Sequence, residues 1–328
     1  MLSFEDFKGQ SAHIGQMQTD FSAHAFVHAY LLCGPRGTGK KSVARLCAMA
    51  AVCRAEGEKP CGTCGPCRRI LSDTHPDVHT IRPEKGKQTI GVDVMRDMIA
   101  EVGVKSFENT TKVLIIPDAQ KMTPAAQNCL LKTLEEPPED TVFFLITEQP
   151  GALLPTITSR CRVIRFHPLS SEACEKRLVA LGQTPMDARR RARMAEGCVG
   201  QALEIDEERL NLLEKLTRDV FGVHRSGDVL PVVNLYKDDK ERQKMILDLL
   251  EGAVRDILRA QAGGSALEES GYAREAEAYA HAVPLEGGLA LAQAVTKARM
   301  MMASNVAFAS AFESVLLKIS EEYAKWPW

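Results

Sequence analysis

Hydrophobic and polar residues form two kinds of segment in the first half of the chain. Short, largely apolar runs predict buried strands at residues 29–32, 112–118, 141–147 and 162–166. Between them, apolar residues recur every three or four positions, as at Val94, Met98 and Val102, which is typical of amphipathic helices. Buried strands that alternate with helices predict a parallel sheet that is covered by helices on both faces.

No β pattern follows in the second half of the chain. Residues 168–205 predict a small helical unit with breaks at Gly182, Gly197 and Gly200. Amphipathic helices are predicted after it at residues 208–222, 229–262, 265–283 and 287–322, with loops at Gly227, Gly263–Gly264 and Gly287–Gly288. The fold class is therefore α/β followed by all-α.

Length and composition are those of an ordinary soluble globular protein. The 328 residues, 45% hydrophobic and 26% charged, suggest two or three domains. Since no apolar run approaches the roughly 18 residues that span a bilayer and no signal peptide is evident, we expect a cytoplasmic protein without a membrane partner. The net charge of -2 gives no bulk attraction to nucleic acid, so any DNA contact requires a local patch.

A glycine-rich loop follows the first apolar run and precedes a helical pattern. Strand, loop and helix together make a phosphate-loop match credible. Glycines let successive backbone N–H groups point into one concavity, where the lysine also attracts phosphate. The predicted phosphate-binding residues are Gly34, Gly37, Thr38, Gly39, Lys40, Lys41 and Ser42.

The loop departs from the phosphate-loop pattern directly after Lys40. That pattern has Ser or Thr there as a hydroxyl ligand for Mg²⁺, and this chain has Lys41. An ammonium group has no lone pair for a metal, and Ser42 lies one residue late, about a quarter turn round the helix. We therefore expect no Mg²⁺ in this site, and the sequence leaves open whether ATP or ADP binds.

Four of the ten cysteines form a compact array within residues 53–67. Cys53, Cys61, Cys64 and Cys67 have the spacing C-x7-C-x2-C-x2-C. Four thiolates at this spacing can close a tetrahedral Zn²⁺ site with no open coordination position. The array therefore predicts a structural zinc ion rather than a catalytic one.

Other polar clusters have ordinary explanations. His75, Asp77 and His79 are an alternative metal site, but alternation along a short strand explains them better. Two features are candidates for DNA contact: the run Arg189–Arg193 and the helix residue Lys132. The alternative for each is a solvated helix surface.

Several motifs occur together in one order. These are His28–Leu31, the phosphate loop, the four-cysteine array, Leu130–Pro138 (LLKTLEEPP) and Thr158–Cys161 (TSRC). In this order they resemble the AAA+ clamp-loader family of the bacterial DNA polymerase III holoenzyme, a nucleotidyltransferase complex. The motifs cover about residues 1–167, and the helical remainder fits in pattern only.

The resemblance implies three domains and a set of partners. Residues 1–167 would be a nucleotide-binding-like AAA+ P-loop domain with the zinc knuckle, 168–207 a helical lid, and 208–328 a helical collar. The collar would hold a hetero-pentamer with gamma/tau and delta subunits. The sliding clamp and primer–template DNA would be reached through that complex.

The family contains gamma/tau motors that hydrolyse ATP and delta-prime subunits that usually do not. When the acidic strands are aligned, Pro117 stands at the metal-binding Asp and Asp118 at the catalytic Glu. Gly200 stands where the motor has Arg in the lid's sensor motif, whereas Thr147 matches the first sensor. With Lys41, these departures favour the delta-prime type, with an ATP-hydrolysing gamma/tau type as the alternative.

Arg160, in the TSRC motif, is the predicted catalytic contribution, made in trans. The resemblance implies that it reaches a neighbouring subunit's ATP as an arginine finger. A local ion pair with a carboxylate is the alternative. A third possibility, an unrelated zinc-bearing DNA-binding module, is disfavoured by the near-neutral charge and the motif order.

Overall fold

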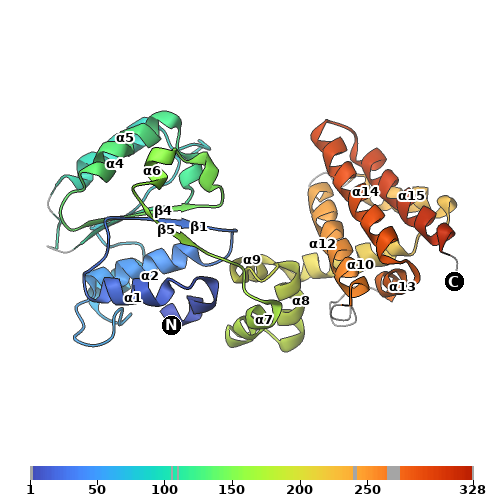
Figure 1. Ribbon diagram of the computed structural model, residues 1–328, viewed down its shortest axis with the longest axis horizontal. Helices are drawn as coiled ribbons and strands as arrows, with labels where there is room; N and C mark the ends of the chain where they lie inside the picture. The colour runs from blue at the N-terminus through green and yellow to red at the C-terminus, as the bar shows by residue number, and fades with distance from the viewer. Residues whose placement is uncertain (1–2, 105, 109–110, 239–241, 264–273, 327–328) are drawn as a thin grey trace. The chain divides into compact units, whose positions relative to one another are not determined.

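The computed structural model describes residues 3–104, 106–108, 111–238, 242–263 and 274–326. The chain divides into two compact units (Figure 1). The first contains Met1–Arg177 and Glu196–Gln201, and the second contains Leu178–Ala195 and Ala202–Trp328. The division into three domains at residues 167 and 207 stays a prediction.

A five-stranded parallel sheet forms the centre of the first unit, as predicted. Its strands, in spatial order, are β2 (Val78–Thr80), β3 (Lys112–Ile116), β4 (Thr141–Thr147), β1 (Ala29–Cys33) and β5 (Arg162–Arg165). Every residue of β1, β3 and β4 is buried, because helices cover both faces. The loop after β1 leaves the sheet between the carboxyl ends of β4 and β5, the usual place for a ligand site in such sheets.

The two faces of the sheet have separate cores (Figure 1). On one face α1 (Ile14–Ser22) and α2 (Lys40–Val52) pack on alternate strand residues that include Tyr30 and Phe144. On the other face α4 (Val92–Val102) and α5 (Pro124–Glu135) pack on the intervening residues, such as Leu114 and Phe143. Additional elements are η1 (Phe4–Gln10), α3 (Gly65–Leu71), α4 (Val92–Val102), η2 (Ala119–Lys121), α5 (Pro124–Glu135), η3 (Pro150–Ala152) and α6 (Pro155–Thr158).

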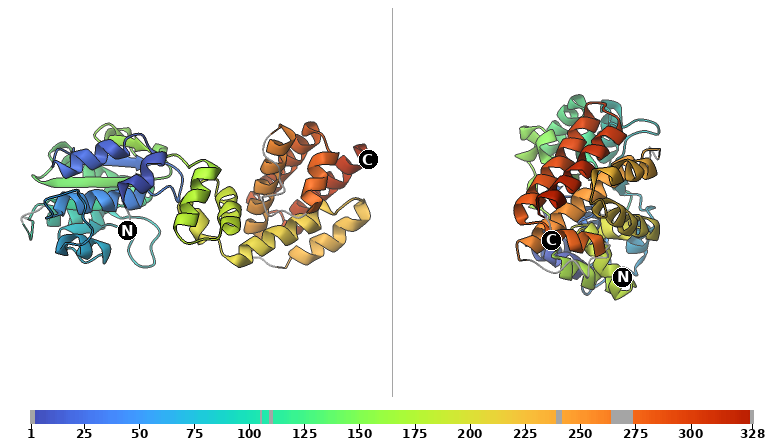
Figure 2. Two further views of the ribbon diagram at one scale, coloured as in Figure 1. Left: turned by 90° about the horizontal axis from the view of Figure 1, so that it is seen from below. Right: turned by 90° about the vertical axis from the view of Figure 1, so that its right-hand side faces the viewer.

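The described part of the second unit is helical, and most of its helices share a core of residues between Leu213 and Tyr323. Buried aromatic residues, among them Phe221, Tyr279 and Phe312, lie within that core. The helices α14 (Leu285–Ala303) and α15 (Phe308–Lys325), coloured orange-red to red, lie side by side in both figures (Figures 1 and 2). The elements from Ser171 onward are α7 (Ser171–Ala180), α8 (Pro185–Met194), α9 (Val199–Glu204), α10 (Glu207–Phe221), η4 (Ser226–Asp228), α11 (Val229–Tyr236), α12 (Gln243–Gln261), α13 (Arg274–Ala282), α14 (Leu285–Ala303) and α15 (Phe308–Lys325).

Two predicted long helices are wrong, because each is two helices. The segment 229–262 contains α11 and α12, and the segment 287–322 contains parts of α14 and α15. The second break is at Asn305, whose φ of 61° is a left-handed conformation that Asn tolerates at a helix end. Residues 264–273 of the predicted helix 265–283 lie outside the described residues.

The loop predicted at Gly287–Gly288 is also wrong, since both glycines lie inside α14. A Cβ on Gly287 would lie 2.3 Å from Val283 Cγ1, so a close approach explains this glycine. Within the described ranges, no helix is both long enough and apolar enough to cross a membrane.

Candidate functional site

The glycine loop joins the end of β1 to the start of α2, as its pattern predicts. The backbone N–H of Gly34 donates to the carbonyl of Thr147, at 3.2 Å, so the end of β4 lies against the loop. Thr38 turns inward and donates from its hydroxyl to the Pro35 carbonyl at 2.8 Å. The structure therefore brings Thr147 and the loop together, while the Thr147 hydroxyl itself accepts a bond from the Gln149 amide at 3.0 Å.

Lys40 is bound by the carbonyl groups of its own loop. Its ammonium donates to the carbonyl oxygens of Gly34 and Pro35, each at 2.6 Å. The residue is only 6% exposed, and this burial lowers the pKa of Lys40. A phosphate that used this lysine would have to replace both carbonyl contacts.

The start of α9 packs directly on the phosphate loop within the first unit. Gly200 donates from its backbone N–H to the Gly37 carbonyl at 2.8 Å, and Gln201 Nε2 donates to the Arg36 carbonyl at 2.8 Å. A Cβ on Gly200 would lie 2.9 Å from Gly37 Cα. The predicted break at Gly200 is therefore wrong: this glycine lies inside α9, and its missing side chain permits the contact.

The close contact at Gly200 gives a first prediction. Gly200→Ala should push α9 away from the loop and lower the free energy of unfolding by about 1–3 kcal/mol, the usual cost of overpacking. Urea unfolding measures this change, and hydrogen exchange at the Gly200 amide reports the lost bond. Gly15→Ala is the matched control, because a Cβ there meets nothing within 4 Å. Equal stability of the two variants would show that α9 does not press on the loop.

The remaining predicted positions of this site have other neighbours. Lys41 lies at the start of α2, where partial burial of its ammonium group and, next, the charge of Arg82 lower its pKa. The Asp118 carboxylate lies 3.1 Å from Lys121 Nζ in an ion pair on the surface. Pro117 has no side-chain donor atom for a metal. Lys41, Pro117 and Asp118 therefore do not provide the hydroxyl and the carboxylate that would together bind Mg²⁺.

The four predicted cysteine ligands converge. Their Sγ atoms all lie within 4.8 Å of one another, and Cys53 Sγ is 4.0 Å from Cys64 Sγ. Tetrahedral zinc with Zn–S bonds of about 2.3 Å places sulfur atoms about 3.8 Å apart, so the cluster could hold a metal ion. Cys53 follows α2 directly, while Cys64 and Cys67 lie at the start of α3, so packing of these two helices brings the ligands together.

Local hydrogen bonds prepare one of these thiols for a metal. The backbone N–H of Cys64 donates to Cys61 Sγ at 3.3 Å. This bond, with a second from the Thr63 backbone, lowers the pKa of Cys61 to about 6. Burial instead raises the pKa of Cys67. Because metal binding displaces thiol protons, Cys61 offers a thiolate most readily.

The alternative metal site at His75, Asp77 and His79 is not formed. Among the described residues, the four cysteines are the only group of potential ligands close enough to hold a metal. The Asp77 carboxylate accepts the backbone N–H groups of Phe107 and Glu108, at 2.7 and 3.1 Å. Asp77 therefore fixes a backbone turn.

Arg160 has a local partner that sequence reasoning did not name. One Nη atom lies 2.6 Å from the Glu135 carboxylate, and the other donates to the Thr156 carbonyl at 2.9 Å. Glu135 ends α5 and Arg160 follows α6, so only the packing of these helices reveals the pair. The local ion pair is thus present in the isolated chain, and both side chains are partly exposed, by 35% and 49%.

The two candidate DNA contacts are placed differently. Lys132 is exposed on α5, and the arginine run on α8 is half-buried. Arg191 of that run donates to the Ile205 carbonyl, and Arg189 and Arg193 also have partners. These contacts account for part of the run without a nucleic acid.

The sequence profile of a family described as "DNA polymerase III, delta subunit" matches residues 9–170. DNA polymerase III subunit delta' of Bacillus subtilis is 36% identical over 244 residues, which cover 72% of this chain and 73% of that protein. The chain belongs to the delta-prime family of DNA polymerase III subunits.

Two further relatives show how far the likeness of this delta-prime family member extends. DNA polymerase III subunit delta' of Escherichia coli is 41% identical over 142 residues, covering 43% of this chain and 42% of that protein. DNA polymerase III subunit tau of Bacillus subtilis is 39% identical over 176 residues, covering 53% of this chain and 31% of that protein. Both kinds of subunit predicted from the motif order are thus among its relatives.

Proposed function

We propose that this chain is a clamp-loader subunit that does not hydrolyse ATP and completes the ATP site of a neighbouring subunit with Arg160. The observation that supports the proposal is the set of contacts that the phosphate loop makes with other groups of this chain. Lys40 is bound to the Gly34 and Pro35 carbonyl groups, and Gly200 lies against Gly37. The loop is therefore closed by contacts from its own chain.

Hydrolysis requires more than a phosphate loop. A P-loop enzyme holds Mg²⁺ with a loop hydroxyl and an acidic strand residue, and it adds positive charge at the γ-phosphate. Here those positions are Lys41, Pro117 and Gly200, none of which supplies the required group. Nucleotide binding to Gly34, Gly37, Thr38, Gly39 and Lys40 without Mg²⁺ is compatible with this proposal.

The energies favour release of Arg160 to a partner. An exposed ion pair such as Arg160–Glu135 contributes about 0.2–1 kcal/mol. An arginine finger accelerates phosphoryl transfer by about 10³–10⁵, equivalent to about 4–7 kcal/mol of transition-state stabilisation. Loss of the local pair would therefore cost little compared with the transition-state stabilisation that Arg160 would supply.

The proposed partners follow from the family. They are gamma/tau and delta subunits in a hetero-pentamer, with the sliding clamp and primer–template DNA reached through that complex. Residues 168–207 would act as the lid and 208–328 as the collar. Zinc at Cys53, Cys61, Cys64 and Cys67 would be structural, because four thiolates leave no position for a substrate.

The experiment that tests the idle site is ATP hydrolysis by the purified chain. We expect no turnover above background, and Lys41→Thr should not restore it, because Pro117 still provides no ligand. The gamma/tau partner, assayed alone, is the positive control for the assay. A turnover of about 1 s⁻¹ by the isolated chain would overturn the proposal.

An ATP-hydrolysing gamma/tau type is the second candidate. The intact Gly34, Gly39 and Lys40 and the likeness to a tau subunit favour it. The same assay separates the two, because a motor would lose its turnover in the Lys40→Ala variant whereas an idle site has none to lose.

A further inference from the structure

A pocket of about 300 Å³ lies next to the start of α2, on the face of the sheet that α2 covers. Residues from the first turns of α2, the end of α3 and the edge strand β2 line it. Those with polar side chains are Lys41, Arg45, Asp73, His75, Thr80 and Arg82. The zinc, nucleotide and arginine-finger roles proposed above do not use this pocket.

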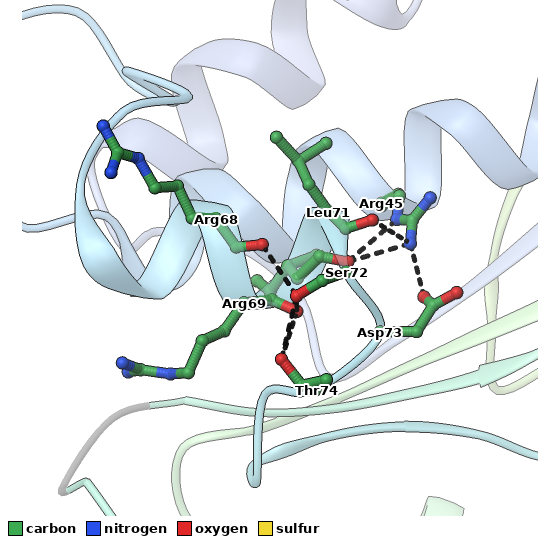
Figure 3. Close-up of polar contacts among 8 residues, drawn as sticks. Arg45, Arg68, Arg69, Leu71, Ser72, Asp73 and Thr74 are labelled. Carbon is green, nitrogen blue, oxygen red and sulfur yellow. Dashed lines mark hydrogen bonds and ion pairs between the residues drawn. The ribbon is translucent and has the colours of Figure 1, made fainter.

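The pocket has an excess of positive charge. Arg45 is already committed: its Nη2 donates to the Ile70 and Leu71 carbonyls at 2.8 and 3.1 Å and pairs with Asp73 (Figure 3). This pairing neutralises the only carboxylate among the residues that line the pocket. Among the described residues, neither Lys41 nor Arg82 forms an ion pair with a carboxylate, so two cationic side chains line the pocket in addition to the Arg45–Asp73 pair.

His75 adds a buried donor without a partner. It is 4% exposed, and its Nδ1 accepts the backbone N–H of Asp77 at 3.2 Å. A neutral imidazole that accepts at Nδ1 has its proton on Nε2. Within the described part of the chain, Nε2 makes no hydrogen bond. Buried polar atoms are normally hydrogen-bonded, so this residue, which lines the pocket, has a hydrogen-bond donor that no group of the described chain uses.

We propose that this pocket binds the phosphate or pyrophosphate group of a small molecule. Lys41 and Arg82 supply the charge, and His75 Nε2–H supplies a hydrogen bond. A phosphate monoester has a charge of about −1.5 to −2 near pH 7, which matches these two cations. The volume is at the lower end for small-molecule sites, which favours a compact anion.

The position of the pocket separates it from the nucleotide loop. Lys40 points back to Gly34 and Pro35, whereas the next residue, Lys41, lines the pocket. Lys41, which replaces the expected magnesium ligand, would thus bind the anion in this pocket.

Titration of the full zinc-loaded chain with inorganic pyrophosphate tests the proposal. Calorimetry should show binding, and ¹⁵N-histidine NMR should show a shift of His75 Nε2. Arg82→Gln should weaken binding about tenfold or more, the loss expected for a charge-assisted hydrogen bond. Arg68→Gln is the matched control, because Arg68 is exposed on α3 and extends away from Arg45 and Asp73 (Figure 3).

Lys40→Gln distinguishes the pocket from the phosphate loop. Any binding of pyrophosphate to the phosphate loop should be lost in this variant, whereas the Arg82-dependent binding should stay. Loss of binding in Lys40→Gln together with normal binding in Arg82→Gln would place the anion on the loop and refute the proposal. No binding at millimolar pyrophosphate would refute it as well, and the histidine signals of the unmodified chain give that answer without any variant.

Parallel titrations identify the source of the phosphate group. Arg82-dependent binding of inorganic phosphate or pyrophosphate indicates a free anion, and Arg82-dependent binding of ADP alone indicates a nucleotide. Both results support the proposal. Arg82-dependent binding of a single-stranded oligonucleotide, with no small anion bound, would mean a nucleic-acid surface and would refute it.

Discussion

Removing zinc from the chain will disorder the knuckle between Cys53 and Cys67 and destabilise the first unit. Structural zinc sites have apparent binding free energies of about 10–16 kcal/mol at neutral pH in isolated zinc-finger peptides. Residues 54–64 form neither helix nor strand, and the helix that follows them, α3 (Gly65–Leu71), is short. The metal should therefore supply most of the local stability.

Elemental analysis of the chelator-washed protein should return about one zinc per chain, the content of a closed four-cysteine site. Cys64→Ser should lower that content and increase hydrogen exchange across residues 53–71. Cys129→Ser is the matched control, because Cys129 lies on α5 outside the cluster and is not part of the metal group. An intact fold with no zinc would contradict this prediction.

Arg160→Ala should slow DNA-stimulated ATP hydrolysis and clamp loading by the assembled complex. One site that depends on this arginine should lose about 10³–10⁵ in rate. The drop for the whole complex should be smaller, because the other motor sites keep their own arginines. Folding should change little, since the lost ion pair with Glu135 contributes about 0.2–1 kcal/mol.

Glu135→Gln is the control that separates a role in trans from a structural one. It removes the ion pair and leaves the arginine, so hydrolysis by the complex should stay at the unmodified rate. If Glu135→Gln and Arg160→Ala slow the complex equally, Arg160 acts by holding α5 to α6. Steady-state ATPase rates with primed DNA and clamp measure both variants under the same conditions.

Elements whose signal lies within a few neighbouring residues could be predicted from the sequence. The strand Thr141–Thr147 is apolar at every central position, so its burial on both faces was predictable. The four cysteines are close in sequence, and a tight turn brings three of them together. Thr123, directly before Pro124, caps α5 by accepting the backbone N–H of Ala126 at 3.2 Å.

What the sequence could not reveal depends on contacts between distant segments. Arg160 and Glu135 meet only because α5 and α6 pack together. Gly200 looked like a helix break because its close neighbour, Gly37, is far away along the chain. The unpaired Nε2 of His75 depends on burial, which no local pattern records. The break at Asn305 was missed because Asn occurs in many conformations, and its left-handed φ is a property of the folded chain.

The most direct test of the central claim compares Arg160→Ala with Lys40→Ala in the assembled clamp loader. If the chain's own site is idle and its arginine serves a neighbour, Arg160→Ala should slow DNA-stimulated ATP hydrolysis, and Lys40→Ala should leave the rate nearly unchanged. The opposite result, in which Lys40→Ala cripples loading and Arg160→Ala does not, would mean that the chain is a motor.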